Sequence, residues 1–404
     1  MSENRIDLPY SQPFLDDDDV AAVTAVLHSH YLTTGPAVSD FEAEFAAAVG
    51  APYAAACSSG TAALHLTALA LGLGSGDLVV VPTLTFLATA NSVRLCGAEI
   101  IFADVDADTG LMTEATFMAA LSRVDTAVRA VYPVHLNGQC VEMHAIRRLA
   151  AARDIRVIED ACHALGADYN VTPVGACTLS DMAVFSTHPV KAITTGEGGV
   201  VTTRDLTLFR RVIQLRNHGM TRDASEFLHR DLAFDGEGRP HPWYYEMAEP
   251  GLNYRASDIH CALGTSQLRK LVHFVARRRE LALRYDKLLA PFAPLLRPVP
   301  RVPWCNSAFH LYPVLIDFSA TDMTRTEVMQ ALSARGIGTQ VHYLPVHCQP
   351  YYRRHYGALE MPGAYQYYAR VLSLPLFPAM ADTDIDRVVV ALGEAIPALH
   401  SVMV

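Results

Sequence analysis

The chain has 404 residues, of which 51% are hydrophobic and 18% charged, and a formal net charge of −10. This length allows a large sheet domain and a smaller second domain, and the acidic balance argues against nucleic acid as a partner. The eight cysteines show neither a CxxC pair nor a metal-ligand spacing, which favours free thiols in a reducing compartment and no metal site. Because the amino terminus lacks a basic region followed by an apolar core and no apolar run could span a bilayer, we expect a cytoplasmic protein without membrane contact.

The first 75 residues predict helices separated by turn-rich connections. A helix is expected over residues 20–28, and the turn-rich piece 31–36 follows it. Residues 39–42 have the pattern of a capping box, which predicts a helix that ends near Gly50. An apolar helix is then expected to extend to residue 73, and its start contains Ser58, Ser59, Gly60 and Thr61. A helix start with small residues presents free N–H groups to a phosphate, although an ordinary N-cap uses the same residue types.

Residues 78–160 alternate between apolar runs typical of buried strands and helix-like segments. The expected strands cover 78–81, 99–102, 128–134 and 156–159, and the expected helices cover 114–121 and 143–153. This alternation predicts an α/β fold with a mostly parallel sheet and a ligand site beyond the carboxyl ends of its strands. Glu159 and Asp160 end the last of these strands, and periodicity alone fits either acid to that site. His163 follows as a hydrogen-bonded core residue or as part of the site.

The stretch 181–199 carries the strongest chemical signal. Residues 182–185 suit a buried strand, which places Ser186, His188 and Lys191 beyond its carboxyl end. Lys191 lies in a loop rich in threonine and glycine, and the glycines allow close approach to a bound group. We interpret Lys191 as an amine that forms a Schiff base with an aldehyde cofactor, against the alternative of an exposed loop lysine. An acid at the same edge can hold a pyridinium nitrogen protonated, so lysine, acid and phosphate-binding helix start together indicate pyridoxal 5′-phosphate.

The rest of the chain predicts a helical segment and then a second domain. A helix is expected over 206–217, and the polar stretch 221–250 has the length of a lid, a binding loop or a disordered excursion. Asn253 fits a cap before a helix over 257–271, and another helix covers 272–289. Prolines between 291 and 303 mark a boundary, which gives domains 1–290 and 291–404. The second domain is expected to contain strands over 309–316 and 338–344 and a helix over 325–335.

Four sequence blocks resemble the nucleotide-sugar aminotransferases of the fold-type I pyridoxal phosphate enzymes. They are HPVKAITTGEGG at 188–199, PWYYE at 242–246, GLNYRASDIHCALGTSQL at 251–268 and HYLPVHCQPYY at 342–352. The resemblance extends over nearly the whole chain and points to the branch of pseudaminic acid biosynthesis. It implies an aspartate aminotransferase-like fold, with a large mostly parallel sheet domain and a smaller C-terminal α/β domain.

The resemblance also implies residue roles. Lys191 is expected to carry the Schiff base and Asp160 to face the pyridine nitrogen. The implied cofactor-binding residues are Ser59, Gly60, Thr61, Phe86, Asp160, His163, Ser186, Lys191 and Asn253, with the ring of Phe86 stacked on the cofactor rather than filling the core. The sugar site is expected to contain Tyr10, Thr33, Thr34 and Gly35, and also His342 and Tyr343 if these face the cleft rather than pack at a strand end. In the family the asparagine matching Asn253 reaches into the neighbouring subunit, which implies a homodimer with shared active sites.

The activity implied is transfer of an amino group from L-glutamate to C4 of a UDP-linked 4-keto-6-deoxy-N-acetylhexosamine. Two alternatives stay open: a GDP- or dTDP-linked 4-keto sugar, and a non-catalytic regulatory protein that binds pyridoxal phosphate. The absence of a basic patch or DNA-binding module argues against the regulator. A related branch that removes the sugar 3-hydroxyl has histidine in place of the lysine, so Lys191 argues against that branch. Thr187 and residues 137–139 depart from the family pattern, in positions that bear on the choice of sugar.

Overall fold

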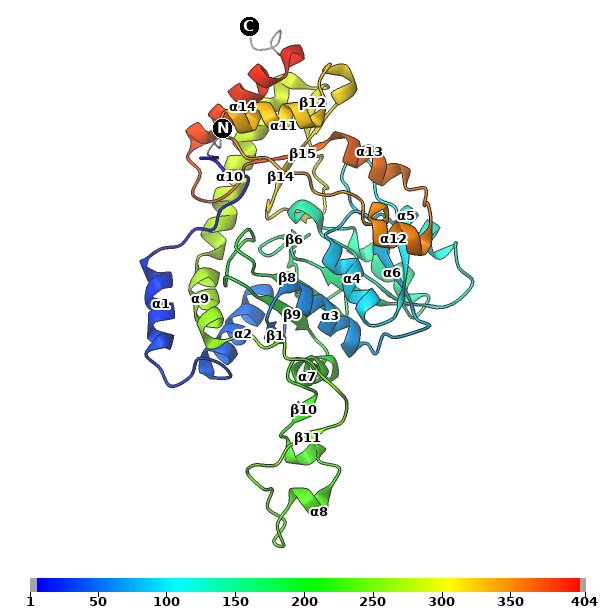
Figure 1. The fold of residues 1–404 in the computed structure, drawn as a ribbon, viewed down its shortest axis with the longest axis vertical. Coiled ribbons are helices and arrows are strands. Elements are labelled where there is room, and N and C mark those ends of the chain that lie inside the picture. Colours follow the sequence, from blue (N-terminus) through cyan, green and yellow to red (C-terminus); the bar gives the residue numbers. More distant parts are fainter. Residues whose placement is uncertain (1–5, 400–404) are drawn as a thin grey trace.

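A computed structural model describes residues 6–399 of the chain. Residues 1–5, part of the terminus in which no targeting signal was expected, and residues 400–404 of the predicted second domain lie outside the described residues. A seven-stranded sheet forms the centre, in the order β1-β9-β8-β5-β4-β2-β3 (Figure 1). Its strands are β1 (Tyr53–Cys57), β2 (Leu78–Pro82), β3 (Glu99–Ala103), β4 (Val128–Val131), β5 (Arg156–Asp160), β8 (Met182–Ser186) and β9 (Gly199–Thr203).

The sheet is mostly parallel, which confirms the predicted fold class. Only β9 runs against its neighbours β1 and β8, whereas the pairs β8·β5, β5·β4, β4·β2 and β2·β3 are parallel. The strands are almost wholly buried, as expected for a sheet covered on both faces. The helices that follow them are α3 (Gly60–Ala70), α4 (Leu87–Leu95), α5 (Glu114–Leu121), α6 (Met143–Ala151) and α7 (Leu206–Leu215).

The strand directions bring the end of β5 and the loop that follows β8 to the same edge of the sheet. Strands β5 and β8 are parallel neighbours with Asp160 opposite Val184, so both end at the same side of the sheet. Residues 187–198 then connect β8 to the antiparallel β9, and Ser186 pairs with Gly199 across the opening of this loop. The Lys191 loop therefore leaves and re-enters the sheet at the edge where Asp160 lies.

Helices α1 (Asp17–Leu27) and α2 (Pro36–Val49) pack against α9 (Asp258–Arg269). The predicted capping box at 39–42 is wrong, because α2 begins four residues earlier, with Gly35 as its N-cap and Pro36 in its first turn. The free N–H groups of this helix start are satisfied from a distance: Gly35 and Ala37 donate 2.8 and 3.0 Å hydrogen bonds to the carboxylate of Asp258. A carboxylate from another helix thus replaces the local cap.

A second hydrophobic cluster surrounds the small antiparallel sheet β12-β14-β15, built from β12 (Leu296–Pro298), β14 (Tyr312–Ile316) and β15 (Val371–Leu374). Around it lie α10 (Leu271–Leu289), α11 (Arg325–Ala334) and α14 (Asp382–Ala395) (Figure 1). The cluster draws on Leu281 and Tyr285 of α10 as well as on later residues. The domain boundary at residue 290 stays a prediction. Helices α12 (Pro350–Tyr356) and α13 (Pro362–Arg370) lie in the segment between α11 and β15.

The strand predicted over residues 338–344 is not formed. This segment is irregular and has only single contacts with its neighbours: Gln340 forms an isolated bridge with Ser373, and Gly338 donates to Leu8 O at 2.8 Å. Although β15 is the edge strand of its sheet and has one side free, the segment pairs with it only at Gln340 and does not run along it. His342 and Tyr343 therefore lie on a loop.

Residues 220–247 form an arm that projects from the body of the molecule (Figure 1). Short strands β10 (Met220–Thr221) and β11 (Glu246–Met247) pair at its base, and α8 (Arg230–Ala233) lies near its tip. Trp243 on this arm is 69% exposed. As expected for 221–250, most of the arm is irregular. In the described part of the chain, no helix combines the length and the apolar character that crossing a bilayer requires.

Candidate active site

A cavity of about 510 Å³ opens at the carboxyl ends of β5 and β8. Eleven of the predicted site residues line it, and they come from segments far apart in the sequence: Tyr10, Ser59, Gly60, Thr61, Phe86, Asp160, His163, Ser186, Lys191, His342 and Tyr343. Its wall also contains Thr85, Thr89, Cys162, His188, Glu197, His310 and Gln340. Phe86 at the start of α4 is 56% exposed, so its ring is free to contact a bound molecule.

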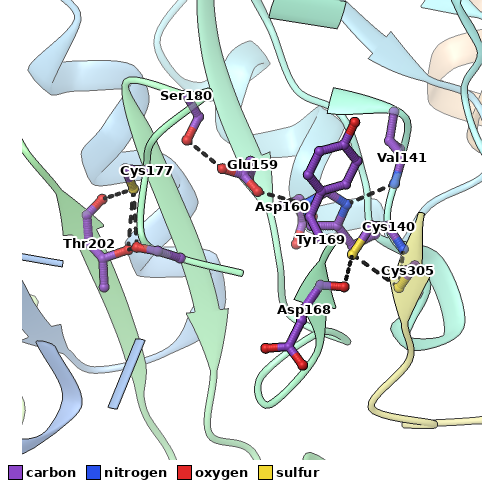
Figure 2. Close-up of polar contacts among 12 residues, drawn as sticks. Cys140, Val141, Glu159, Asp160, Asp168, Tyr169, Cys177, Ser180, Thr202 and Cys305 are labelled. Atoms are coloured by element: carbon purple, nitrogen blue, oxygen red, sulfur yellow. Dashed lines mark hydrogen bonds and ion pairs between the residues drawn. The ribbon is translucent and has the colours of Figure 1, made fainter. Parts of the chain in front are cut away.

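The two acids at the end of β5 point in opposite directions, as successive strand residues do. Asp160 lines the cavity, whereas Glu159 is buried in the protein, where it meets His135 Nε2 at 2.7 Å and accepts a hydrogen bond from Ser180 (Figure 2). Because His135 Nδ1 accepts the N–H of Val141, its Nε2 carries the proton that bonds Glu159. Of the two acids, only Asp160 is therefore placed to contact a molecule bound in the cavity.

The carboxylate of Asp160 is fixed through both oxygens. Thr89 on α4 donates a 2.7 Å hydrogen bond to Oδ2, and the N–H of Cys162 lies 3.2 Å from Oδ1. Thr85 contacts Thr89 at 2.8 Å between their hydroxyls. These bonds fix the orientation of the buried carboxylate.

Lys191 lies half-buried in the loop between β8 and β9. Burial lowers the pKa of its amine from the usual value, and the nearby Cys162 and Asp160 partly oppose that shift. A lower pKa increases the fraction of free amine at neutral pH, which suits a nucleophile or a proton carrier. The loop itself is held by Thr187, whose N–H donates to Gly198 O at 3.0 Å and whose hydroxyl lies 2.6 Å from that of Thr195. Thr187 is fully buried under the loop and does not line the cavity.

Gly198 and Gly199, at the end of this loop, are required by packing inside the protein. A Cβ on Gly199 would lie 2.4 Å from the backbone oxygen of Ser59, and one on Gly198 would meet the hydroxyls of Thr195 and Thr187. The start of β9 and the start of α3 are therefore in backbone contact. This contact brings the lysine loop and the helix start together.

The start of α3 forms the anion-binding end of the cavity. Ser59 is its N-cap and accepts the N–H of Ala62 at 3.0 Å, which leaves the N–H groups of Gly60 and Thr61 without an intrahelical partner. A Cβ on Gly60 would lie 2.7 Å from Cβ of Ser186, so only glycine fits between the helix start and the end of β8. Free N–H groups and the positive end of a helix bind a phosphate at such a place.

Three buried histidines and a tyrosine form the opposite wall. His163 Nδ1 accepts the N–H of Asn137 at 3.3 Å, so its Nε2 carries a proton and donates to the Tyr343 hydroxyl at 3.2 Å. The rings of His163 and His310 are 4.3 Å apart, and His342 Nδ1 contacts the Ser373 hydroxyl at 2.8 Å. Burial lowers the pKa of all three imidazoles, to about 3 for His342. These histidines are therefore neutral in the folded protein at physiological pH.

Four predicted residues do not reach this cavity within one chain. Thr34 and Gly35 line a separate cavity of about 260 Å³, together with Arg216 and Arg255. Thr33 is exposed and pairs with Ser257 in an isolated bridge. Asn253 is exposed on the segment whose next residues run beside the end of β1: Ser58 donates to Tyr254 O at 2.8 Å. Their assignment to the site therefore requires a second copy of the chain.

Sequence reasoning missed several cavity residues, above all Thr89 and His310. Thr85 precedes α4 and Thr89 lies in its first turn, so two hydroxyl residues close together at the start of a helix could have drawn attention to them. His310 precedes β14 with no local pattern that distinguishes it from a packed histidine.

The residues present fit pyridoxal 5′-phosphate. An anion-binding helix start, an oriented buried carboxylate and an amine of lowered pKa face one cavity and match the phosphate, ring nitrogen and aldehyde of this cofactor. Together with the fold, they define a pyridoxal phosphate-dependent enzyme of fold type I.

A model of the DegT/DnrJ/EryC1/StrS aminotransferase family matches residues 13–393. The chain belongs to this family, and it is a pyridoxal phosphate-dependent sugar aminotransferase. The spore coat polysaccharide biosynthesis protein SpsC of Bacillus subtilis is 38% identical over 392 residues, 96% of this chain and 97% of SpsC.

Solved structures with the same fold extend over nearly the whole chain. Helicobacter pylori PseC, an aminotransferase involved in the biosynthesis of pseudoaminic acid, is 28% identical with a TM-score of 0.87 and covers 97% of this chain and 99% of its own. Spr1654 from Streptococcus pneumoniae has been solved in a PLP form and a PMP form. The PLP form is 25% identical with a TM-score of 0.85 and covers 97% of this chain and 99% of its own.

Proposed function

We propose that the enzyme transfers the amino group of L-glutamate to C4 of a UDP-linked 4-keto-6-deoxy-N-acetylhexosamine. In this proposal it acts as the UDP-4-amino-4,6-dideoxy-N-acetyl-β-L-altrosamine transaminase of pseudaminic acid biosynthesis. The observation that carries the transfer chemistry is the presence of Lys191 and Asp160 in one cavity with the start of α3. The choice of sugar is supported by the four sequence blocks and by the likeness to PseC.

The proposed residue roles follow from charge and position. When bound, the cofactor supplies an aldehyde for amine exchange and a ring that withdraws electrons. Lys191 would hold the cofactor aldehyde through Nζ, and its amine would carry a proton to and from the reacting carbon of the substrate. Asp160 keeps the proton on the ring nitrogen. His163 and Tyr343 orient groups on the opposite side of the cavity, and Phe86 covers the ring.

Borohydride reduction of the purified enzyme, followed by peptide mass mapping, tests the central role. A pyridoxyl group on Lys191 is expected, and none in Lys191→Ala. A modification at another lysine would contradict the assignment.

The proposed sugar is tested with a panel of substrates. Purified enzyme is supplied with L-glutamate and one of several UDP-, GDP- or dTDP-linked 4-keto-6-deoxyhexoses, and 2-oxoglutarate formation is measured. The UDP-linked N-acetyl sugar is expected to give the highest kcat/KM. Faster turnover of a GDP- or dTDP-linked sugar would favour the first alternative, and no 2-oxoglutarate with any sugar would favour the non-catalytic one.

The proposal includes a homodimer with shared sites in the cytoplasm, consistent with eight cysteines that are all free. Thr33, Thr34, Gly35 and Asn253 would then reach the cavity of the partner. Mixing inactive Lys191→Ala with inactive Asn253→Ala under exchange conditions tests this arrangement. Mixed dimers contain one site with both residues intact, so activity should reappear. If each chain built its own complete site, the mixture would stay inactive.

A further inference from the structure

Cys140 and Cys305 lie with their sulfur atoms 3.1 Å apart, although 165 positions separate them in the chain (Figure 2). Cys140 follows the 3₁₀ turn Leu136–Gly138 after β4, and Cys305 begins the short strand β13 (Cys305–Asn306). A second contact joins the two residues: the backbone N–H of Cys140 donates to Cys305 Sγ at 3.1 Å. A disulfide has an S–S length of about 2.05 Å, so a shift of about 1 Å would join them.

We propose that Cys140 and Cys305 are a modification site at which low-molecular-weight disulfides oxidise the pair to an internal disulfide. The proposal goes beyond sugar amination and does not depend on which sugar is bound. Its physical effect is to lock the seam between residues 136–141 and residues 302–311, which belong to the two predicted domains.

The surroundings assign different roles to the two thiols. Cys305 is only partly buried, so a small disulfide can reach it, and the N–H of Cys140 stabilises a thiolate there. The neighbouring Cys140 thiol, and after it the N–H of Cys140, lower the pKa of Cys305. Cys140 is fully buried, and its thiol points at the backbone oxygen of Asp168 (Figure 2). The neighbouring Cys305 thiol and burial raise the pKa of Cys140. Cys305 is therefore the attacking thiol and Cys140 the resolving one.

The oxidant in this reaction is the small disulfide, written here as RSSR. The Cys305 thiolate attacks one sulfur of RSSR, breaks its S–S bond and releases one thiolate, which takes up the proton that Cys305 lost. Cys140 then gives up its proton and attacks Cys305 Sγ, and the second RS group leaves as a thiol. Two protein thiols are oxidised, and one RSSR is reduced to two RSH.

The seam that the disulfide would lock leads directly to the cavity. The backbone oxygen of Gly138 accepts hydrogen bonds from the Ser307 hydroxyl at 2.9 Å and from the N–H of Ala308 at 3.3 Å. The preceding residue, Asn137, donates its N–H to His163. Five residues after Cys305 lies His310, whose ring is tilted against that of His163. The pair thus joins the two segments that support the histidine wall.

The structure provides an optical reporter for the reaction. Trp304 precedes Cys305, and its indole N–H donates to the backbone oxygen of Cys140 at 3.0 Å. A disulfide next to an indole quenches its fluorescence. The other tryptophan, Trp243, lies on the projecting arm, so Trp243→Phe leaves Trp304 as the sole emitter.

The test uses reduced holoenzyme incubated with oxidised glutathione. We expect the loss of two hydrogen atoms without a retained glutathionyl group, a peptide linking Cys140 to Cys305, weaker Trp304 emission in the Trp243→Phe background and a Tm higher by roughly 5 °C. Dithiothreitol should reverse all four changes. The proposal is overturned if the wild-type enzyme yields no peptide that links Cys140 to Cys305. It is also overturned if glutathione stays on Cys305 and no internal disulfide forms.

Variants separate the two roles. Cys140→Ser should retain one glutathionyl group on Cys305, because the resolving thiol is missing, whereas Cys305→Ser should remain unmodified at Cys140. Cys348→Ser, which removes another partly buried thiol, is the matched control and should behave like the wild type. Persistence of the Tm rise in Cys305→Ser would contradict the assigned pair.

Discussion

Thr89 and Asp160 are joined by a 2.7 Å hydrogen bond between a threonine hydroxyl in the first turn of α4 and Oδ2 of the buried carboxylate that ends β5. The two residues are 71 positions apart, so the bond depends on the packing of α4 over the sheet edge. It fixes the orientation of the carboxylate before any ligand binds. The proposed electrostatic role of Asp160 thus depends on a residue without charge.

Replacing Thr89 by valine keeps the shape and removes the hydrogen bond. A bond to a charged group contributes about 1.5–3 kcal/mol, so kcat should fall about 10- to 100-fold. Thr89→Ser keeps the hydroxyl and should recover most of the activity. Steady-state kinetics measure this change in kcat. The visible absorbance of the bound cofactor shows whether each variant is fully loaded with it. Equal kcat for Thr89→Val and wild type would rule out this positioning role.

The two acids of β5 should respond differently to loss of charge. Asp160→Asn should lower turnover by on the order of 10³-fold, because the ring nitrogen loses its anionic partner. Glu159→Gln should leave most of the turnover intact but reduce the free energy of unfolding by about 1–3 kcal/mol, because its bonds with His135 and Ser180 are buried. Urea unfolding and a glutamate-dependent amination assay distinguish the two outcomes. Similar losses of activity in both variants would contradict the assignment.

The neutral histidine wall predicts a dependence of stability on pH. His163, His310 and His342 have pKa values lowered by burial, so below about pH 6.5 the unfolded chain binds protons that the folded chain does not. The free energy of unfolding should therefore fall as the pH drops from about 6.5 to 5, by up to about 1.4 kcal/mol per pH unit for each histidine. His342→Gln should remove one such contribution in urea unfolding. An unchanged slope would mean that His342 is protonated in the folded protein.

The contact between Gly60 and Ser186 predicts a weak cofactor complex in Gly60→Ala. The added Cβ would lie 2.7 Å from Cβ of Ser186, which is attached to the backbone of β8 and cannot rotate away. We expect the affinity for pyridoxal 5′-phosphate to fall by roughly 10-fold or more, because the helix start must move from the phosphate. Gly74→Ala, whose added atom meets nothing closer than 3.9 Å, is the control. Fluorescence titration of the apoenzyme measures both.

The sequence allowed prediction of those parts of the site that lie on local patterns. Strand ends indicated Lys191 and the pair Glu159 and Asp160, because each follows an apolar run whose direction in a parallel sheet is known. The small residues at 59–61 indicated a helix start that could bind a phosphate. The α/β class followed from the same alternation. The resemblance added the cofactor and the residue roles.

The remaining features depend on contacts between distant residues. Asp258 caps α2 in place of the predicted local box, and no pattern near Ser39 could indicate that carboxylate. The segment 338–344 has the composition of a strand but meets the free side of β15 at a single position, where Gln340 pairs with Ser373. Thr89 and His310 likewise became site residues only when distant segments met at the sheet edge.

The antiparallel pairing of β8 and β9 places Lys191 in the most local connection of the central sheet. Its neighbours in the sheet are joined by long crossovers, which close slowly, whereas this hairpin can close early in folding. The reactive amine is therefore carried by a segment that can form ahead of the distant contacts that orient Asp160. For redesign, this means that the loop from 187 to 198 can be varied without changing the strand order, provided that its hydrogen bonds with Ser11 and Gln267 are kept.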